Sequence, residues 1–322
     1  MKFLRLPAVV LFSFGLLHTS IATAVTPAVK ITQVKPVLST SLSGASGDDV
    51  SAITSTAQSI ILVGTVEGPG GGWVNSAALG SSDGYIAAID PKGRHLWDLR
   101  LGTGLDDIAT AVTQDSAGNY WVVGAATISP PIATPTPSAS PTVLNPDGVI
   151  VDPVPPTQIA LSRIELWSVT PQGTLSASYY LDTPWSVHPQ TISITGTKVS
   201  ITGEISSSGK VKRFTVPFTL GGTFGALVQS PNFPTPTNLS AVVGSSTWKS
   251  QLSSGSIPGL PSWRPKAPTQ VLLRYSKSGK LTDARFIVGT PLGLRWQKEI
   301  GLILITERNA RFGLTIVSPL AG

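Results

Sequence analysis

The stretch from Asp107 to Gly124 reads DIATAVTQDSAGNYWVVG, and it decides the fold. Polar and apolar residues alternate over its first half, from Ile108 to Thr113, which is the period of a half-buried β-strand. The next residues, DSAGN at 115–119, favour a turn. An apolar run from Tyr120 to Val123 follows and ends at Gly124. The stretch therefore predicts a β-hairpin whose second strand closes with a glycine.

Similar stretches recur along the chain, so the sequence is that of a repeat protein. The copies close at Gly64, Gly203, Gly244 and Thr306, the fourth position lacking the glycine. The shortest spacing, from Gly203 to Gly244, is about 40 residues, which is the length of one propeller blade. The longer spacings fit one blade plus an insertion.

A second hairpin pattern alternates with the first. Its best copy, GYIAAIDPKGRHLWDLRLG, runs from Gly84 to Gly102 and has DPKG as its turn. Proline presets φ at the second position of a turn and glycine tolerates positive φ, so this tetrapeptide is a mechanistic turn signal. Further copies occupy residues 163–181, 214–228 and 271–289. Two hairpins per period predict four strands per blade.

The two ends of the chain complement each other. Residues 310–322 match only the first strand of the second hairpin, and residues 36–49 match the missing outer strand. We therefore expect a strand at Val37 to Leu42 to pair with Phe312 to Val317. This pairing would complete a β-propeller of five four-stranded blades and remove exposed sheet edges. An open stack of blades, or a pair of β-sandwiches, is the alternative.

The hairpin 107–124, followed by the Asp-Pro-x-Gly hairpin, resembles the bacterial β-propeller repeat called SBBP. The pattern of that repeat is roughly D-x-A-x-A-hydrophobic-x-x-D-x-x-G-N-x-Y-V-x-G. The resemblance is specific over roughly residues 36–130 and weaker afterwards. It implies an all-β propeller fold in an extracytoplasmic setting. The family carries no agreed activity and no catalytic residues to transfer.

Composition and the N-terminus indicate export. A basic start, an apolar run from Ala8 to Leu17 and the small-residue motif at 22–24 predict a signal peptide over 1–24. A single propeller domain over 25–322 follows, with a Pro/Ser/Thr-rich insertion at 128–158. The net charge is only +6 and no basic cluster is present, which argues against nucleic-acid binding. We expect no transmembrane segment after cleavage.

The insertions share one kind of connection. If the strands of a blade are named A to D from the centre outward, the insertions 67–82, 128–158 and 245–269 all join B to C. The B–C and D–A connections emerge on one side of a propeller, which we call the loop face. Insertions gathered on one face indicate a binding face in repeat proteins.

Aromatic residues in these loops are the candidate ligand-binding residues. Trp73, Trp185, Trp248 and Trp263 are assigned to the loop face, and His188 lies beside Trp185. Rigid rings supply contact area at low entropic cost, so they suit recognition of a protein or a carbohydrate at the cell envelope. The alternative is that each ring packs beneath its own loop. A spacer-like scaffold of the envelope is a further alternative.

Four acidic residues lie at the ends of D–A loops: Asp48, Asp49, Asp106 and Asp107. Calcium binding is one alternative for them, because carboxylate oxygens suit that cation. A second is that Asp107 or Asp49 acts as acid or base in a polysaccharide hydrolase or lyase. We favour a scaffold role, in which each carboxylate accepts backbone N–H bonds where the chain turns. No catalytic residue is assigned, and no other metal or cofactor is expected.

Export makes a direct prediction. Cleavage after Ala24 gives a mature protein that begins at Val25, because Ala22 and Ala24 are the small residues that signal peptidase requires. N-terminal sequencing or the intact mass of protein from an export-competent host checks this. An unprocessed N-terminus in the extracytoplasmic fraction would contradict it.

Overall fold

The computed structural model describes residues 29–43, 45–128, 161–207, 210–230, 239–260 and 263–317. In these ranges the chain forms 21 strands in five sheets and no helix, so the all-β expectation is confirmed. No helix long and apolar enough to cross a membrane occurs there. The expected signal peptide and residues 129–158 of the expected insertion lie outside the described residues.

Three of the five sheets consist of consecutive strands. Blade 1 contains β3 (Asp49–Ser55), β4 (Ile60–Glu67), β5 (Ser82–Ile89) and β6 (His95–Leu101). Blade 2 contains β7 (Asp107–Gln114), β8 (Tyr120–Ala126), β9 (Arg163–Val169) and β10 (Leu175–Asp182). Blade 3 contains β11 (Ser186–Thr195), β12 (Lys198–Ser207), β13 (Lys210–Thr219) and β14 (Val228–Ser230).

The other two sheets each receive a strand from the N-terminal segment. Blade 4 contains β15 (Ser240–Val243), β16 (Ser246–Ser253), β17 (Thr269–Tyr275), β18 (Leu281–Phe286) and the added strand β1 (Ile31–Gln33). Blade 5 contains β19 (Thr290–Gln297), β20 (Gly301–Arg308), β21 (Arg311–Val317) and the added strand β2 (Leu38–Thr40). One segment therefore holds two neighbouring blades at their outer edges.

The pairing of the two chain ends is confirmed. Strand β2 runs antiparallel to β21, with Leu38 opposite Leu314 and Thr40 opposite Phe312. Strand β1 was not predicted from the sequence. It lies parallel to β18, with Ile31 opposite Ala284.

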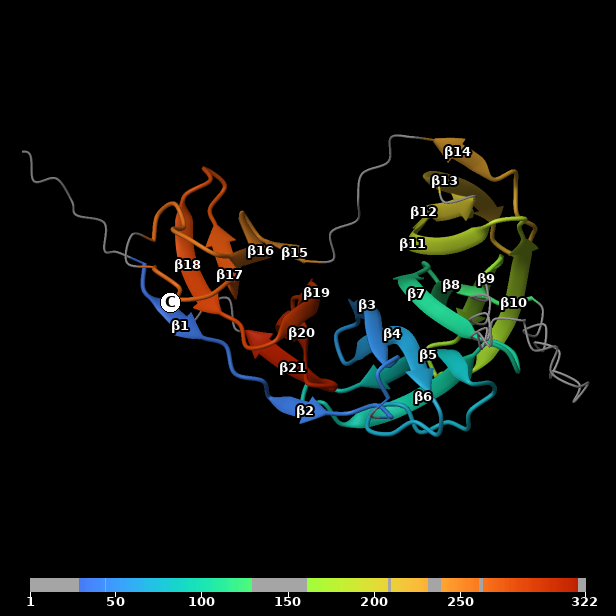
Figure 1. Ribbon diagram of the computed structural model, residues 1–322, viewed down its shortest axis with the longest axis horizontal. Helices are drawn as coiled ribbons and strands as arrows, with labels where there is room; N and C mark the ends of the chain where they lie inside the picture. Colours follow the sequence, from blue (N-terminus) through green and yellow to red (C-terminus); the bar gives the residue numbers. More distant parts are fainter. Residues whose placement is uncertain are drawn as a thin grey trace, which may run out of the picture.

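The blades form a propeller-like arc whose innermost strands face a common centre (Figure 1). Strand β15 packs beside β19, β19 beside β3, β3 beside β7, and β7 beside β11. Within the described residues, β11 and β15 do not pack in this way, and an opening separates blades 3 and 4 (Figure 1). Closure of the ring is therefore not shown and stays a prediction.

Each end of the arc covers its core in a different way. On blade 3, Ile201 and Val216 pack toward blade 2, whereas the alternate positions Glu204 and Arg213 are charged, partly exposed and paired with each other at 3.4 Å. This alternation is that of an antiparallel sheet with one solvated face. On blade 4, the β16–β17 connection folds over the sheet and buries Ile257 and Leu260 against β17. The core of each end is therefore kept from water.

A bulge in the innermost strand explains the closing glycine of blades 1, 2 and 3. The register of β3 shifts after Val50, that of β7 after Ala109, and those of β11 and β19 after Pro189 and Pro291. The bulge brings a backbone carbonyl oxygen of the innermost strand close to the neighbouring second strand of the blade. A Cβ on Gly124 would lie 1.9 Å from the oxygen of Ile108. Only glycine tolerates this approach.

The same clash recurs in the other copies of the repeat. A Cβ on Gly64 would lie 2.0 Å from the oxygen of Asp49, and one on Gly203 would lie 2.3 Å from the oxygen of His188. The closing glycines are therefore one structural device, repeated in blades 1, 2 and 3.

Gly244 does not belong to this device, and the assignment of its repeat was wrong by one strand. It lies in the short turn between β15 and β16, with φ of 58°, so it serves the turn. The stretch AVVG therefore forms the innermost strand of blade 4, and the second strand comes after it. Consequently the B–C connection of this blade spans 254–268 instead of 245–269.

The closing glycine gives a stability prediction. Gly124→Ala should lower the free energy of unfolding by about 3 kcal/mol or more, because the new methyl group meets a backbone oxygen that cannot move freely. Gly255→Ala is the control, since a Cβ there would have no neighbouring heavy atom within 4 Å and the φ of this glycine is ordinary. That variant should change stability by no more than ~0.5 kcal/mol. Urea denaturation measures both; equal effects would contradict the bulge explanation.

Candidate binding surface

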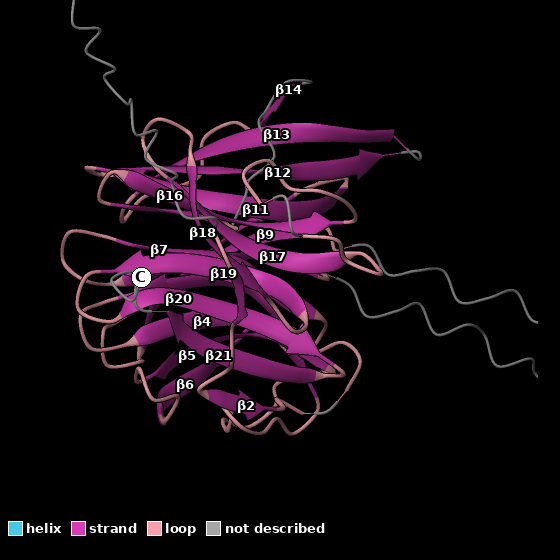
Figure 2. Ribbon diagram, turned by 90° about the vertical axis from the view of Figure 1, so that its left-hand side faces the viewer, coloured by secondary structure: helices cyan, strands magenta, loops and turns pink. Residues whose placement is uncertain are grey.

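Connections between strands collect on two opposite faces. The strands run nearly along the direction of view of Figure 1, so their turns gather at two ends in the perpendicular view (Figure 2). The loop face carries the described B–C connections after β4, β16 and β20, and the D–A connections after β2, β6, β10 and β18. The opposite face carries short turns such as Asp90–Gly93 and Asp115–Gly118, each closed by a backbone hydrogen bond.

Two of the four candidate tryptophans are buried and cannot contact a ligand on the loop face. Trp73 is 2% exposed and lies in the core between blades 5 and 1, where its Nε1 donates to the oxygen of Gly93 at 3.2 Å. Trp248 is 0% exposed and lies in β16, not in a loop, where it packs between blades 4 and 5. The loop assignment of Trp248 was wrong because Gly244 was taken as the end of a strand.

The remaining candidates lie apart from one another. Trp185 is half-buried against the core of blades 2 and 3, and Trp263 is half-buried against blade 4 with its Nε1 bonded to Ser253. His188 is exposed, but it belongs to β11 opposite Glu204 and not to a loop. The four tryptophans thus pack in four separate clusters and form no common patch. A binding role for Trp185, His188 or Trp263 stays a prediction.

Asp48 and Asp107 accept the backbone hydrogen bonds that a scaffold role predicts. The backbone N–H of Ser43 donates to Asp48 at 2.7 Å, and that of Thr103 donates to Asp107 at 2.7 Å. Each carboxylate lies two residues before the bulge of its strand, so the two positions are equivalent. The equivalence pairs Asp48, and not Asp49, with Asp107.

The other two acidic residues make hydroxyl contacts. Asp49 accepts from Ser51 Oγ at 2.6 Å, and Asp106 accepts from Ser81 Oγ at 3.1 Å. No group of three or more His, Asp or Glu side chains that could hold a metal ion is found in the part of the chain that the structure describes. Calcium binding at these residues stays a prediction without a ligand set.

A buried ion pair fixes the first insertion. Arg100 Nη1 lies 3.0 Å from Asp83 Oδ2, and both side chains are almost fully buried. Arg100 Nη2 also donates to the oxygen of Gly68 at 2.9 Å, while Asp83 accepts the N–H groups of Leu79 and Gly80. The pair therefore ties both ends of the β4–β5 connection to blade 1. Its role is structural.

Two carboxyl groups of blade 2 are held away from water. Burial raises the pKa of Asp107 to about 6; its hydrogen bonds from Thr103 oppose the shift. Burial likewise raises the pKa of Glu165 to about 7, and the charge of Asp107 adds to the shift while Arg163 opposes it. Asp107 is 0% and Glu165 is 4% exposed, so neither group is accessible to a large substrate. These groups make folding depend on pH.

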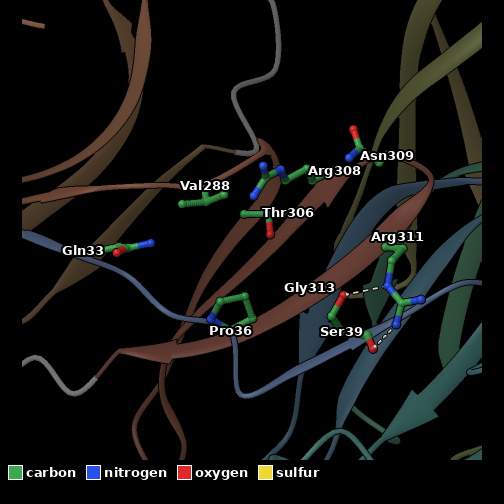
Figure 3. Close-up of a pocket in the computed structure, with 9 residues that line it drawn as sticks. All are labelled: Gln33, Pro36, Ser39, Val288, Thr306, Arg308, Asn309, Arg311 and Gly313. Carbon is green, nitrogen blue, oxygen red and sulfur yellow. Dashed lines mark hydrogen bonds between the residues drawn. The ribbon is translucent and has the colours of Figure 1, made fainter.

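Two hollows open on the loop face, one on each side of the turn between β20 and β21. The basic groove, ≈ 440 Å³, lies toward blade 4 and is lined by Gln33, Pro36, Ser39, Val288, Thr306, Arg308, Asn309, Arg311 and Gly313 (Figure 3). The acidic groove, ≈ 430 Å³, lies toward blade 1 and is lined by Ala45, Ser46, Asp48, Asp49, Leu292, Glu307, Ala310 and Phe312.

Strand alternation separates the charges of the two hollows. Thr306 and Arg308 face the basic groove, whereas Glu307 between them faces the acidic one. Sequence reasoning missed this turn, although it predicted the strands on both sides of it. The signal that could have found it is ERNAR at 307–311, a run dense in charge within a chain of which only 12% is charged.

Comparisons with known proteins leave the family of the chain open. No protein-family model matches it. No curated protein matches its sequence either. Among solved structures, a subtype N10 neuraminidase-like protein of A/little yellow-shouldered bat/Guatemala/060/2010 is 11% identical with a TM-score of 0.34, over 84% of this chain and 79% of that one.

Two further solved structures are similarly distant. A protein of unknown function from Bacteroides caccae is 13% identical with a TM-score of 0.28, over 75% of this chain and 83% of that one. Sqt1 from Chaetomium thermophilum is 12% identical with a TM-score of 0.32, over 88% of this chain and 100% of that one.

The buried carboxyls predict how stability varies with pH. Both folded-state pKa values lie above the ordinary values of 3.8 and 4.5, so the folded protein binds more protons than the unfolded chain between those values and about 7. The free energy of unfolding should therefore fall as pH rises from about 4 to about 7. Asp107 contributes on the order of 3 kcal/mol to this fall, at 1.36 kcal/mol per pKa unit.

Asp107→Asn tests this, because asparagine keeps an acceptor for Thr103 without a titrating charge. Urea denaturation at pH 4.5 and pH 8 should show a smaller difference in the variant than in the unmodified protein. Glu299→Gln, which removes an exposed carboxyl, should leave the difference unchanged. An undiminished difference in Asp107→Asn would refute the assignment.

Proposed function

We propose that this protein is an exported, non-enzymatic binding module that recognises a protein or a carbohydrate of the cell envelope through its loop face. The observation that carries the proposal is the pair of hollows of opposite charge beside the exposed β20–β21 turn. Concave sites of this size, roughly 300–1,000 Å³, are where proteins hold small ligands or the ends of larger ones.

Binding is favoured over catalysis by the state of the acidic residues. A polysaccharide hydrolase needs a carboxyl group within hydrogen-bond reach of the glycosidic oxygen. Asp107 and Glu165 have the raised pKa values that suit an acid, but both are buried beneath other residues. Neither lines either of the two hollows.

A polysaccharide hydrolase or lyase is the second candidate. The observation in its favour is that Asp49 and Glu307 line the same acidic groove, where two carboxyl groups can divide the roles of acid and base. Turnover of a glycan that disappears in Asp49→Asn would support it over simple binding.

The proposed setting follows from the sequence: export through the signal peptide, and the repeat architecture that resembles SBBP propellers. The binding site does not require a closed ring. Blade 5 packs against blade 4 on one side and blade 1 on the other, and both hollows lie along it. The opening between blades 3 and 4 is on the other side of the arc (Figure 1).

The absence of cysteine allows a sharp test of the face. Asn309→Cys places a single thiol at the turn between the hollows, and Lys277→Cys places one on the opposite face. Each variant, coupled to a polyethylene-glycol maleimide, is assayed against immobilised envelope polysaccharide and envelope protein. The label at 309 should reduce binding at least about tenfold because it obstructs both hollows.

The label at Lys277→Cys should leave binding unchanged, and the effect of the label at 309 is measured against unlabelled Asn309→Cys. Equal loss at both sites, or undiminished binding with the label at 309, would refute the loop-face proposal. A protein that binds neither fraction would favour the spacer-like scaffold.

A further inference from the structure

We infer that the basic groove binds the carboxylate groups of an acidic polysaccharide. The inference rests on the proposed function, because it names the ligand class of the same face. It follows from the charge of the groove, from the way its arginines are held, and from the shape of its floor.

The charge of the groove is not neutralised. Arg308 and Arg311 lie directly opposite each other in the register of β20 and β21. Like charges at directly opposed positions destabilise a strand pair. No acidic side chain lines the groove, and neither arginine has a carboxylate partner among the described residues. A concave surface with one sign of charge focuses the field on an oppositely charged ligand.

One arginine is positioned before any ligand arrives. Arg311 donates from Nη2 to the oxygen of Ser39 at 3.0 Å and from Nε to Ser39 Oγ at 3.4 Å (Figure 3). These bonds fix the plane of the guanidinium and leave its Nη1 available to a ligand. Arg308 extends toward Val288 and Thr306 (Figure 3). The two guanidinium groups thus lie in different parts of the hollow, and each suits the planar, two-oxygen geometry of one carboxylate among the several that an acidic polysaccharide carries.

The floor of the groove exists because residue 313 lacks a side chain. Gly313 lies opposite Thr306 in the strand pair. A Cβ on Gly313 would lie 2.9 Å from Thr306 Oγ1 and 3.5 Å from Pro36, so any larger residue would fill the hollow. The turn above it holds Asn309 and Ala310 at φ of 54° and 56°, which is costly for alanine. Unfavourable local conformations of this kind are concentrated at functional sites.

The remaining lining suits a sugar better than an extended peptide. Gln33, Ser39 and Asn309, which are exposed, offer amides and a hydroxyl to a ligand that carries many hydroxyl groups. An extended peptide binds by adding a strand to a free sheet edge. Strands β20 and β21 are hydrogen-bonded on both sides, by β19 and β2 respectively and by each other, so their backbones offer no such edge, and at the groove an acidic peptide could add only to the three-residue edge strands β1 and β2.

The test compares two ligands that differ only in charge. The mature protein is titrated with an oligogalacturonate and with its methyl-esterified form at low and high salt. The acid form should bind at least about tenfold more tightly at low salt, and the difference should shrink at high salt because screening weakens the contact. Arg308→Gln and Arg311→Gln should each weaken binding of the acid form about tenfold, consistent with loss of a charge-assisted hydrogen bond.

Lys277→Gln on the opposite face is the matched control and should bind as the parent does. Gly313→Ala should also abolish binding, because it fills the floor without removing charge. Melting temperatures verify that each variant folds. If Gly313→Ala does not fold, the two arginine variants are sufficient to test the inference.

Several results would overturn the inference. Equal binding of the two ligands, or full affinity in both arginine variants, would mean that binding in the groove does not depend on the charge of the ligand. Arginine-dependent binding of poly-glutamate without binding of the uronate would replace the glycan with an acidic peptide. In these cases the proposed function still stands if the label at Asn309→Cys blocks binding of envelope material; if it does not, the face itself is wrong.

Discussion

The pairing of β2 with β21 is the constraint on which most of the molecule depends. Three residues of the N-terminal segment complete blade 5, and β1 extends blade 4 by the same passage of chain. Leu38 packs into the core shared by blades 5 and 1. The same segment supplies Gln33 of β1, Pro36 of the connection and Ser39 of β2 to the basic groove. The strand that completes the architecture thus builds one wall of the proposed site.

Sequence reasoning found the blades where a repeat kept both its turn and its closing glycine. The hairpin 107–124 was predicted correctly because Asp115 accepts the N–H groups of Ala117 and Asn119, and because Gly124 admits the bulge of β7. It failed at Gly244, where the glycine serves a turn and alternation alone does not distinguish a first strand from a second. The pairing of the chain ends was predictable because each end is an incomplete copy of the same hairpin. Strand β1, with no counterpart in the repeat, was not.

The face of the candidate site was predictable, and its residues were not. Antiparallel topology places every B–C and D–A connection on one side, whatever their sequences. The position of the tryptophans in glycine-rich segments suggested that their rings are exposed. Burial of a large apolar side chain stabilises the fold by about 1.5–3 kcal/mol, so a loop that carries such a ring folds inward where the core has room for it. Trp73 fills the space between blades 5 and 1 in this way. The charged turn at 307–311 indicates a binding site only when the strand register, which places Arg308 opposite Arg311, is known.

Alternation within one hairpin explains how two hollows of opposite charge come to lie so close together. Thr306 and Arg308 face one side of blade 5 and Glu307 faces the other, so a two-residue turn separates a basic surface from an acidic one. The basic surface spans two blades that are joined at their outer edges by the N-terminal segment. A ligand held between Arg308 and the residues of that segment binds only the folded arrangement, and it therefore stabilises the docking of β1 and β2 by mass action. Recognition and the integrity of the outer edge are then coupled through the same few residues.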